Sequence, residues 1–216
     1  MEECMRIYVV RHGETRSNVE GRLQGQSNDE LNESGVRLAA ITGQGMRGIH
    51  FDECITSPLV RARDTAKLIL QESGNGDTPV LYDDRLKEIS FGIYEGKRIG
   101  VDVPLDVMKD FLHDPFHYEG VEGGETVLQV CRRTQEFLRE LAARDDGKTY
   151  LVATHGCALR CMLNMLYDDP SDFWQGRVPY NCSVNKIEAN AGELKLVEMD
   201  KVYYDLAETV DRYKRF

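Results

Sequence analysis

The chain has 216 residues, of which 41% are hydrophobic and 30% are charged, and its formal net charge is −10 at pH 7. This length and hydrophobic content exclude a disordered chain and are typical of one domain, so we expect a single domain over residues 1–216. The acidic balance argues against a nucleic-acid partner, which needs a basic surface. No apolar run approaches the ~20 residues that span a bilayer, and the acidic start lacks the basic region of a signal peptide. We therefore expect a cytoplasmic protein without a membrane partner.

Strands and helices alternate along the chain. In chain order, the pattern first predicts a strand over 5–10, a helix from Asn32 or Ser34 to about Met46, and a strand over 54–56. A helix to about Gln71 follows, with Ser57 as N-cap and Pro58 at its first position, and then a short strand over 80–82. The last predicted elements are a helix from Glu125 to about Ala143, a strand over 149–153, a helix after Gly156, and a hairpin of 182–188 with 194–199. This alternation predicts an α/β fold, a three-layer sandwich with helices on both faces of a mainly parallel central sheet.

The segment of about residues 91–124 fits this alternation poorly, because it mixes glycine, proline, acidic and aromatic residues. We interpret it as a lid-like insertion over the C-terminal edge of the sheet, where it would form a wall of the substrate site. The tail after Leu206 is expected to dock loosely or to fray.

The first strand ends in the most informative sequence of the chain, Arg11-His12-Gly13. The apolar, largely β-branched run before it is typical of a strand covered on both faces. Open α/β sheets place their ligands at the carboxyl ends of such strands. An arginine and a histidine at that point indicate phosphate chemistry, with Arg11 as a phosphate clamp and His12 as the nucleophile, since neutral imidazole can attack phosphorus without a separate base.

Three further side chains complete a candidate phosphoryl-transfer site. Arg61 lies on the first turn of a helix that follows a strand, where its guanidinium fork could hold phosphate oxygens. His155 follows another buried strand and could face the first histidine. Glu88 is the candidate proton donor to the leaving oxygen, although Glu95 and Glu125 compete with it on spacing alone.

Together these motifs resemble the histidine phosphatase superfamily, in the branch of cofactor-dependent phosphoglycerate mutases and related small-molecule phosphatases. The similarity covers nearly the whole chain. The segments that carry it are Arg11-His12-Gly13-Glu14-Thr15, Asn18, Gly21-Arg22-Leu23-Gln24-Gly25, Ser57-Pro58 with Arg61-Ala62, Glu88 with Phe91-Gly92, Glu95-Gly96, Gly124-Glu125-Thr126 and Thr154-His155-Gly156.

The resemblance implies a role for each matching residue. His12 would become a phosphohistidine, and Glu88 would shuttle the proton. The residues implied to bind the phosphoryl group or the substrate are Arg11, Arg61, His155, Asn18, Gln24 and Gly25. The resemblance also implies a small phosphorylated substrate and no metal or other cofactor, which agrees with the charge that two arginines and two histidines can supply.

The resemblance leaves hydrolysis and transfer open, because phosphatases and mutases share the catalytic core. The mutases resemble one another in a long insertion with a lysine and paired arginines, and here no such pair precedes Gly124. The pair Arg132-Arg133 lies in the following helix and is interpreted as a solvated face. Gly92–Gly96 is more similar to the phosphatase members, which favours a metal-independent phosphomonoesterase. The alternatives are a phosphoglycerate mutase and a non-catalytic phospholigand-binding module, which the retained nucleophile and acid disfavour.

Two other motifs are interpreted as structural. His113 and His117 have a zinc-like spacing, but Pro115 between them opposes a continuous helix and no acidic or cysteine cluster completes the set. Cys157 and Cys161 are four residues apart, on one face of a helix, and are predicted to pack there. The six cysteines form no CxxC pair, so we expect reduced thiols.

Overall fold

The computed structural model describes residues 4–208, so most of the tail expected to fray, residues 209–216, lies outside the described part. A six-stranded sheet with the order β3-β2-β4-β1-β5-β6 forms its centre. Its strands are β1 (Met5–Arg11), β2 (Glu53–Thr56), β3 (Val80–Tyr82), β4 (Thr149–Thr154), β5 (Val184–Asn190) and β6 (Glu193–Lys201). The first four are parallel, whereas β5 and β6 form an antiparallel hairpin at one edge. The predicted mainly parallel sheet with a closing hairpin is therefore confirmed.

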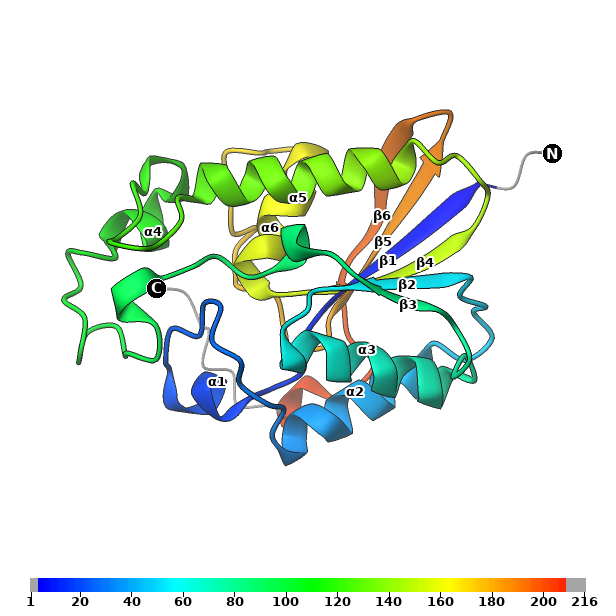
Figure 1. Cartoon of the computed structure of the whole chain (residues 1–216), viewed down its shortest axis with the longest axis horizontal. Helices are drawn as coiled ribbons and strands as arrows, with labels where there is room; N and C mark the ends of the chain where they lie inside the picture. The colour runs from blue at the N-terminus through cyan, green and yellow to red at the C-terminus, as the bar shows by residue number, and fades with distance from the viewer. Residues whose placement is uncertain (1–3, 209–216) are drawn as a thin grey trace.

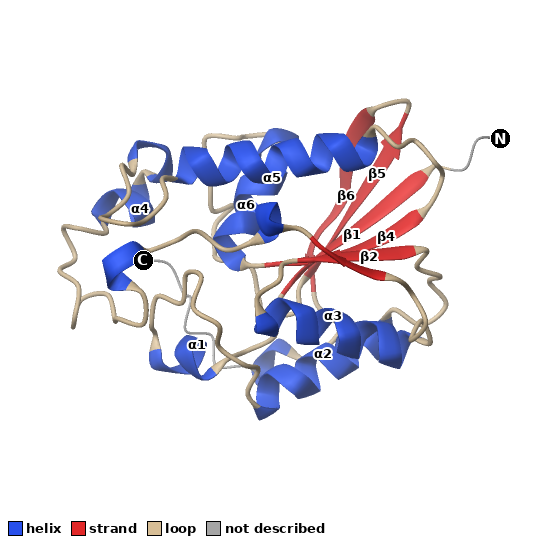
Figure 2. Cartoon of the chain, viewed as in Figure 1, coloured by secondary structure: helices blue, strands red, loops and turns tan. Residues whose placement is uncertain are grey.

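Helices cover both faces of this sheet, which confirms the three layers (Figures 1 and 2). On one face lie α2 (Glu33–Gly45) and α3 (Val60–Ser73), and on the other lie α5 (Val127–Ala142) and α6 (Gly156–Leu163). The short helices α1 (Arg16–Glu20) and α4 (Lys109–His113) lie beyond the end of the sheet. Within residues 4–208, no helix is both long and apolar enough to cross a membrane.

The central strand β1 shows why its sequence is continuously apolar. Ile7 and Val9 are buried in the core between the sheet and helices α5 and α6. Tyr8 and Val10 point to the opposite face, where they belong to the core with helix α3 and with Met46, which follows α2. Because successive side chains of a strand point to opposite faces, a strand between two helical layers needs apolar residues at every position.

The predicted helix ends are right at one helix and wrong at another. Asn32 caps α2, since its side chain accepts a hydrogen bond from the N–H of Gly35 at 2.8 Å. Helix α3 starts at Val60 with Leu59 at the N-cap position, so the prediction of Ser57 as N-cap and Pro58 as first helical residue is wrong. The hydroxyl of Ser57 is engaged at the edge of the sheet instead.

Residues 91–124 lie beyond the carboxyl ends of the parallel strands (Figure 1). They contain α4 and two short 3₁₀ turns, Gly92–Tyr94 and Pro115–His117. Their apolar side chains pack with residues of α5 and α6 in a separate cluster, whose members from this segment include Phe91, Val103, Met108, Phe111, Leu112 and Tyr118. The segment is thus held by its own small core. Its action as a lid stays a prediction.

Candidate active site

The two histidines meet because their strands are neighbours in register. Arg11 at the end of β1 pairs with Thr154 at the end of β4, so the next residue of each strand, His12 and His155, leaves the sheet at the same level. Their ring centroids are 5.2 Å apart, with an angle of 54° between the planes. The structure therefore brings together two imidazoles that are far apart in the sequence.

His12 is buried, and its ring is oriented by the main chain. Its Nδ1 lies 2.7 Å from the carbonyl oxygen of Gly13. A carbonyl oxygen only accepts hydrogen bonds, so Nδ1 carries the hydrogen and Nε2 keeps its lone pair. The pKa of His12 is lowered well below 6.5, first by burial and then by the nearby Arg61 and Arg11. The imidazole is consequently neutral at pH 7, the state in which it can act as a nucleophile.

Gly13, whose carbonyl oxygen orients His12, is itself held in place by its neighbours. The N–H of Gly13 donates to Oγ1 of Thr65 at 2.8 Å. A Cβ atom on Gly13 would lie only 2.7 Å from the carbonyl oxygen of Gly35, at the start of α2. Only glycine at position 13 therefore lets the chain pass this close to α2 while the carbonyl of residue 13 points at the ring of His12.

The two predicted arginines are buried and are held by backbone carbonyl oxygens. Arg11 donates from Nη1 to the carbonyl oxygen of Pro179. Arg61 donates from Nη1 to Ser27 at 2.6 Å and from Nη2 to Gly25 at 2.7 Å, while its Nε is buried without a hydrogen-bond partner among residues 4–208. Burial lowers the pKa of Arg61 to about 10, so the guanidinium stays charged at pH 7. Both arginines line the same pocket as His12.

His155 is fully buried beside His12. Its Nε2 lies 2.8 Å from Oγ of Ser57, and its Nδ1 has no hydrogen-bond partner within the described residues. The pKa of His155 is lowered well below 6.5, first by burial and then by Arg61 and His12. This ring is therefore also neutral at pH 7, with one nitrogen tied to the serine.

Of the three competing glutamates, only Glu88 lines the pocket. Its carboxylate accepts hydrogen bonds from the backbone N–H groups of Ile89 (3.0 Å), Ala158 (2.9 Å) and Cys157 (3.2 Å). Two of these donors belong to the first turn of α6, so the carboxylate caps the helix that His155 begins.

The other two glutamates serve the loops around the pocket. Glu95 accepts a hydrogen bond from the backbone N–H of Gln26 at 2.9 Å, and Glu125 forms an ion pair with Arg133 at 2.9 Å. The geometry thus separates three acids that spacing alone could not rank.

The pocket has a volume of about 230 Å³ and is lined by residues of two kinds. The polar lining residues are Arg11, His12, Asn18, Arg22, Gln24, Gly25, Arg61 and Glu88. The apolar lining residues, called the apolar wall below, are mainly Leu23, Phe91, Ile99, Phe111, Leu112, Trp174 and Val178. Such a combination of cations with apolar surface is typical of sites for small organic anions.

Three of the predicted substrate contacts form one small unit. Asn18 accepts a hydrogen bond at Oδ1 from the N–H of Thr15 at 3.1 Å, as part of the capping box of α1. Gln24 accepts from the hydroxyl of Thr15 at 2.8 Å. Gly25 has a φ of +53°, and its carbonyl oxygen accepts a hydrogen bond from Arg61. All three residues line the pocket, and their contact with a substrate stays a prediction.

Two pocket residues, Trp174 and Val178, could not be predicted because they lie in a region without recognisable motifs. The contact of Ser57 with His155 could not be predicted either, because the local pattern marks this serine only as a helix cap. Trp174 is the only tryptophan of the chain, which was the one available signal. Its indole N–H is buried without a hydrogen-bond partner in the described residues.

The histidine pair of the insertion lies apart from these groups. α4 ends at His113, before Pro115, and His117 is hydrogen-bonded to the carboxylate of Asp114 at 2.8 Å. Among residues 4–208, no group of three or more histidine, cysteine, aspartate or glutamate side chains is placed to hold a metal ion. Cys157 and Cys161 pack as predicted, both buried, with their sulfur atoms 3.9 Å apart.

A buried histidine and two arginines at the carboxyl ends of a parallel sheet are typical of enzymes that act on phosphate groups. Residues 7–201 match the family model described as the histidine phosphatase superfamily (branch 1). The chain therefore belongs to the histidine phosphatase superfamily and is an enzyme of that family, as its motifs predicted.

Individual relatives carry different names. "Probable phosphoglycerate mutase GpmB" of Yersinia pestis (strain Pestoides F) is 31% identical over 191 residues, which cover 85% of each chain. The solved structure of YhfR from Bacillus stearothermophilus has a TM-score of 0.84 and 30% identity, covering 92% of this chain and 98% of the other. A phosphoserine phosphatase from Entamoeba histolytica, solved in complex with 3-phosphoglyceric acid, has a TM-score of 0.77 and 25% identity, covering 92% and 98%. Both mutases and phosphatases are thus among its relatives.

Proposed function

We propose that this protein is a metal-independent phosphomonoesterase that hydrolyses small phosphorylated metabolites through a phosphohistidine at His12. The observation that carries the proposal is the orientation of that ring. Its Nδ1 is bound to the carbonyl of Gly13, so the lone pair of Nε2 is available in a pocket that Arg11 and Arg61 also line. This arrangement supports in-line attack on a phosphoryl group whose charge the guanidinium groups neutralise.

The proposed reaction has two steps. In the first, Nε2 of His12 forms a bond to phosphorus while the bond to the leaving oxygen breaks, and Glu88 gives its proton to that oxygen. In the second, water attacks the phosphohistidine, the Glu88 carboxylate takes a proton from the water, and the bond between nitrogen and phosphorus breaks. Phosphate leaves, and both residues return to their starting states.

The character of the pocket wall supports hydrolysis over transfer between two phosphorylated positions. A mutase holds a bisphosphorylated intermediate and therefore needs a second group of cations away from the nucleophile. The arginine nearest this role, Arg22, is paired with the carboxylate of Glu20 at 2.6 Å and donates to the carbonyl oxygen of Gly96 at 2.7 Å. The rest of the wall is aromatic and aliphatic, which suits an uncharged leaving group.

Phosphoglycerate mutase activity is the second candidate, and the name of the 31% identical relative supports it. The two reactions differ in their products. A mutase interconverts 2- and 3-phosphoglycerate and depends on 2,3-bisphosphoglycerate as a primer, whereas a phosphatase releases inorganic phosphate and an alcohol.

Phosphorus NMR in the presence of EDTA distinguishes these candidates. We expect steady release of phosphate from p-nitrophenyl phosphate and from a panel of phosphorylated metabolites, with no primer-dependent interconversion of phosphoglycerates. His12→Ala should fold but lose turnover, whereas His117→Ala, which changes an exposed histidine, should keep it. Primer-dependent interconversion faster than hydrolysis would establish the mutase instead. Activity of His12→Ala equal to that of the wild type would overturn the nucleophile.

A further inference from the structure

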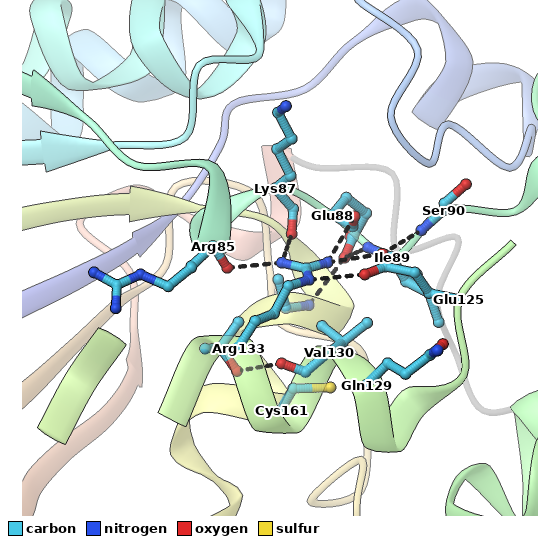
Figure 3. A network of polar contacts seen from close by, with 12 residues as sticks. Arg85, Lys87, Glu88, Ile89, Ser90, Glu125, Gln129, Val130, Arg133 and Cys161 are labelled. Atoms are coloured by element: carbon cyan, nitrogen blue, oxygen red, sulfur yellow. Dashed lines mark hydrogen bonds and ion pairs between the residues drawn. The ribbon is translucent and has the colours of Figure 1, made fainter. Parts of the chain in front are cut away.

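The sequence predicts that Arg133 lies on a solvated face of its helix, and this prediction is wrong. Its side chain is only 17% exposed, and Figure 3 shows it reaching from α5 towards residues 85–90. The adjacent Arg132 is exposed, as predicted. Because α5 turns by about 100° per residue, the two neighbouring arginines face different surroundings.

All five N–H donors of the Arg133 guanidinium are used. Nη1 donates to the carbonyl oxygens of Arg85 (2.7 Å) and Lys87 (2.6 Å), and Nη2 donates to that of Glu88 (3.0 Å). Nε and Nη2 also donate to the two carboxylate oxygens of Glu125, both at 2.9 Å. Three carbonyls of one short segment therefore converge on a single cation (Figure 3).

Glu125 fixes the cation and the segment at the same time. Its Oε2, which binds Arg133, also accepts a hydrogen bond from the backbone N–H of Ser90 at 3.0 Å and one from the side chain of Gln26 at 3.3 Å. The chain is thus anchored on both sides of Glu88. Before it and at it, the carbonyl oxygens of residues 85, 87 and 88 bind Arg133, and after it, the N–H of Ser90 binds Glu125. The side chains of this ion pair are only partly buried, so we infer that the pair contributes more to the geometry of the segment than to stability.

The side chain of Glu88 points away from this anchor into the pocket. Its carbonyl is held by Arg133, while its carboxylate binds the N–H groups of Cys157 and Ala158 at the start of α6. The two ends of one residue are therefore tied to two different helices, α5 and α6. The position of the carboxylate at the pocket depends on both attachments.

We propose that Arg133, oriented by Glu125, is a positioning residue that sets the Glu88 carboxyl at the leaving group. This inference rests on the proposed function, in which Glu88 protonates the leaving oxygen. Arginine is required because its planar fork supplies five donors in fixed directions, whereas lysine has three donors on one nitrogen. Without the guanidinium, the carbonyls of residues 85, 87 and 88 lose a shared partner and the segment can relax.

The test compares substrates whose leaving groups need protonation to different extents. The nitrophenolate of p-nitrophenyl phosphate leaves without a proton, but the alkoxide of an alkyl phosphate such as glycerol 1-phosphate does not. Glu88→Gln should therefore reduce kcat/KM much more for the alkyl than for the aryl ester, within the roughly 10²- to 10⁴-fold range of general acid catalysis. Arg133→Gln should show the same preference, with an alkyl-to-aryl ratio reduced about tenfold or more.

Matched variants separate positioning from folding. Arg132→Gln removes the neighbouring arginine of the same helix and should change neither rate. Arg133→Lys should fall between the wild type and Arg133→Gln. Glu125→Gln keeps the hydrogen bonds of Arg133 to the three carbonyl oxygens, so it should lower the alkyl-to-aryl ratio by less than Arg133→Gln does. This variant still tests the proposal if Arg133→Gln does not fold. Circular dichroism and thermal unfolding verify the fold of each variant.

The outcomes distinguish the two proposals. If Glu88→Gln is selective for the alkyl ester but Arg133→Gln and Glu125→Gln slow both substrates equally, the arginine is merely structural and the positioning role is overturned. If Glu88→Gln itself shows no preference, the assignment of Glu88 as the acid fails, and the role of Arg133 falls with it. A graded loss of the ratio across the variants supports both.

Discussion

The hydroxyl oxygen of Ser57 lies 2.8 Å from Nε2 of His155, although the two residues are 98 positions apart. They follow the adjacent strands β2 and β4, which brings them to one edge of the sheet. Oγ of Ser57 also accepts a hydrogen bond from the backbone N–H of Leu59 at 3.3 Å. The serine therefore links the start of α3 to the His155 ring and holds one ring nitrogen in place.

We predict that Ser57→Ala lowers kcat by about fivefold, because the loss of one hydrogen bond of ~1 kcal/mol frees the ring of His155. Steady-state kinetics with p-nitrophenyl phosphate measures the effect. Ser34→Ala, a partly exposed serine in the first turn of α2, serves as the control and should be silent. An unchanged kcat in Ser57→Ala would show that the serine does not orient His155.

Arg61→Lys keeps a positive charge but loses the planar fork that binds Gly25 and Ser27. We expect the inhibition constant of inorganic phosphate to rise roughly 10- to 100-fold, because charge-assisted hydrogen bonds contribute about 1.5–3 kcal/mol each. Competitive inhibition of hydrolysis by phosphate gives the measurement. Arg63→Lys, two residues further along α3 and paired with Asp64 at 3.2 Å, should leave the constant unchanged. Equal effects of the two substitutions would remove Arg61 from the anion site.

The buried histidines predict how stability depends on pH. The pKa values of His12 and His155 are lowered well below 6.5 in the folded protein, chiefly by burial, whereas the unfolded chain restores them to about 6.5. Below pH 6.5 the unfolded state therefore binds more protons, and the free energy of unfolding falls as the pH falls through the folded-state pKa values. The contribution is fully present only above pH 6.5.

Urea unfolding between pH 7.5 and 5 measures this dependence. Each histidine contributes a slope of up to about 1.4 kcal/mol per pH unit, so His155→Asn should flatten the fall seen in the wild type. The exposed His117 has a pKa raised by its hydrogen bond to Asp114, which gives the opposite sign, and His117→Asn should not flatten it. An unaltered slope in His155→Asn would mean that the ring is charged in the folded state.

A buried ion pair behind the site predicts a large effect on stability. Arg160 on α6 is fully buried and pairs with Asp200 on β6, which is 14% exposed. Asp200→Asn leaves the arginine charge uncompensated and should lower the free energy of unfolding by about 3–5 kcal/mol. Asp200 has a φ of +50°, a conformation that asparagine also tolerates, so the effect reports the charge and not the backbone.

The neighbouring pair of Glu198 and Lys201 provides the comparison for that experiment. Both of its side chains are about 40% exposed, at 37% and 41%. Glu198→Gln should therefore cost less than about 1 kcal/mol in the same urea titration. A similar small cost for Asp200→Asn would show that solvent reaches Arg160.

The sequence predicted the parts of this molecule that depend on local pattern. The apolar runs that end at Arg11 and Thr154 marked strands buried on both faces, and the next residue of each had to lie at the edge where ligands bind. The family also followed from these motifs. Glu88 could be named but not separated from Glu95 and Glu125, because no regular element fixes the direction of a side chain in that region.

Contacts between distant segments could not be predicted. Ser57 satisfies the local rule for a helix cap, but its hydroxyl bonds to His155, which follows another strand. Arg133 lies in a polar stretch of an amphipathic helix, and only the path of residues 85–90 over α5 buries it. Both errors arose because tertiary partners outweighed the local preference of the residue.

The hydrogen bonds between the backbone and the polar residues of the pocket have an evolutionary consequence. Arg11, Arg61 and His12 are all oriented by carbonyl oxygens, which every amino acid supplies. Replacement of a neighbouring side chain therefore leaves these anchors intact as long as the backbone keeps its path. The apolar wall can then diverge freely while the phosphate end is preserved, which explains how one scaffold serves relatives named for different reactions at about 30% identity.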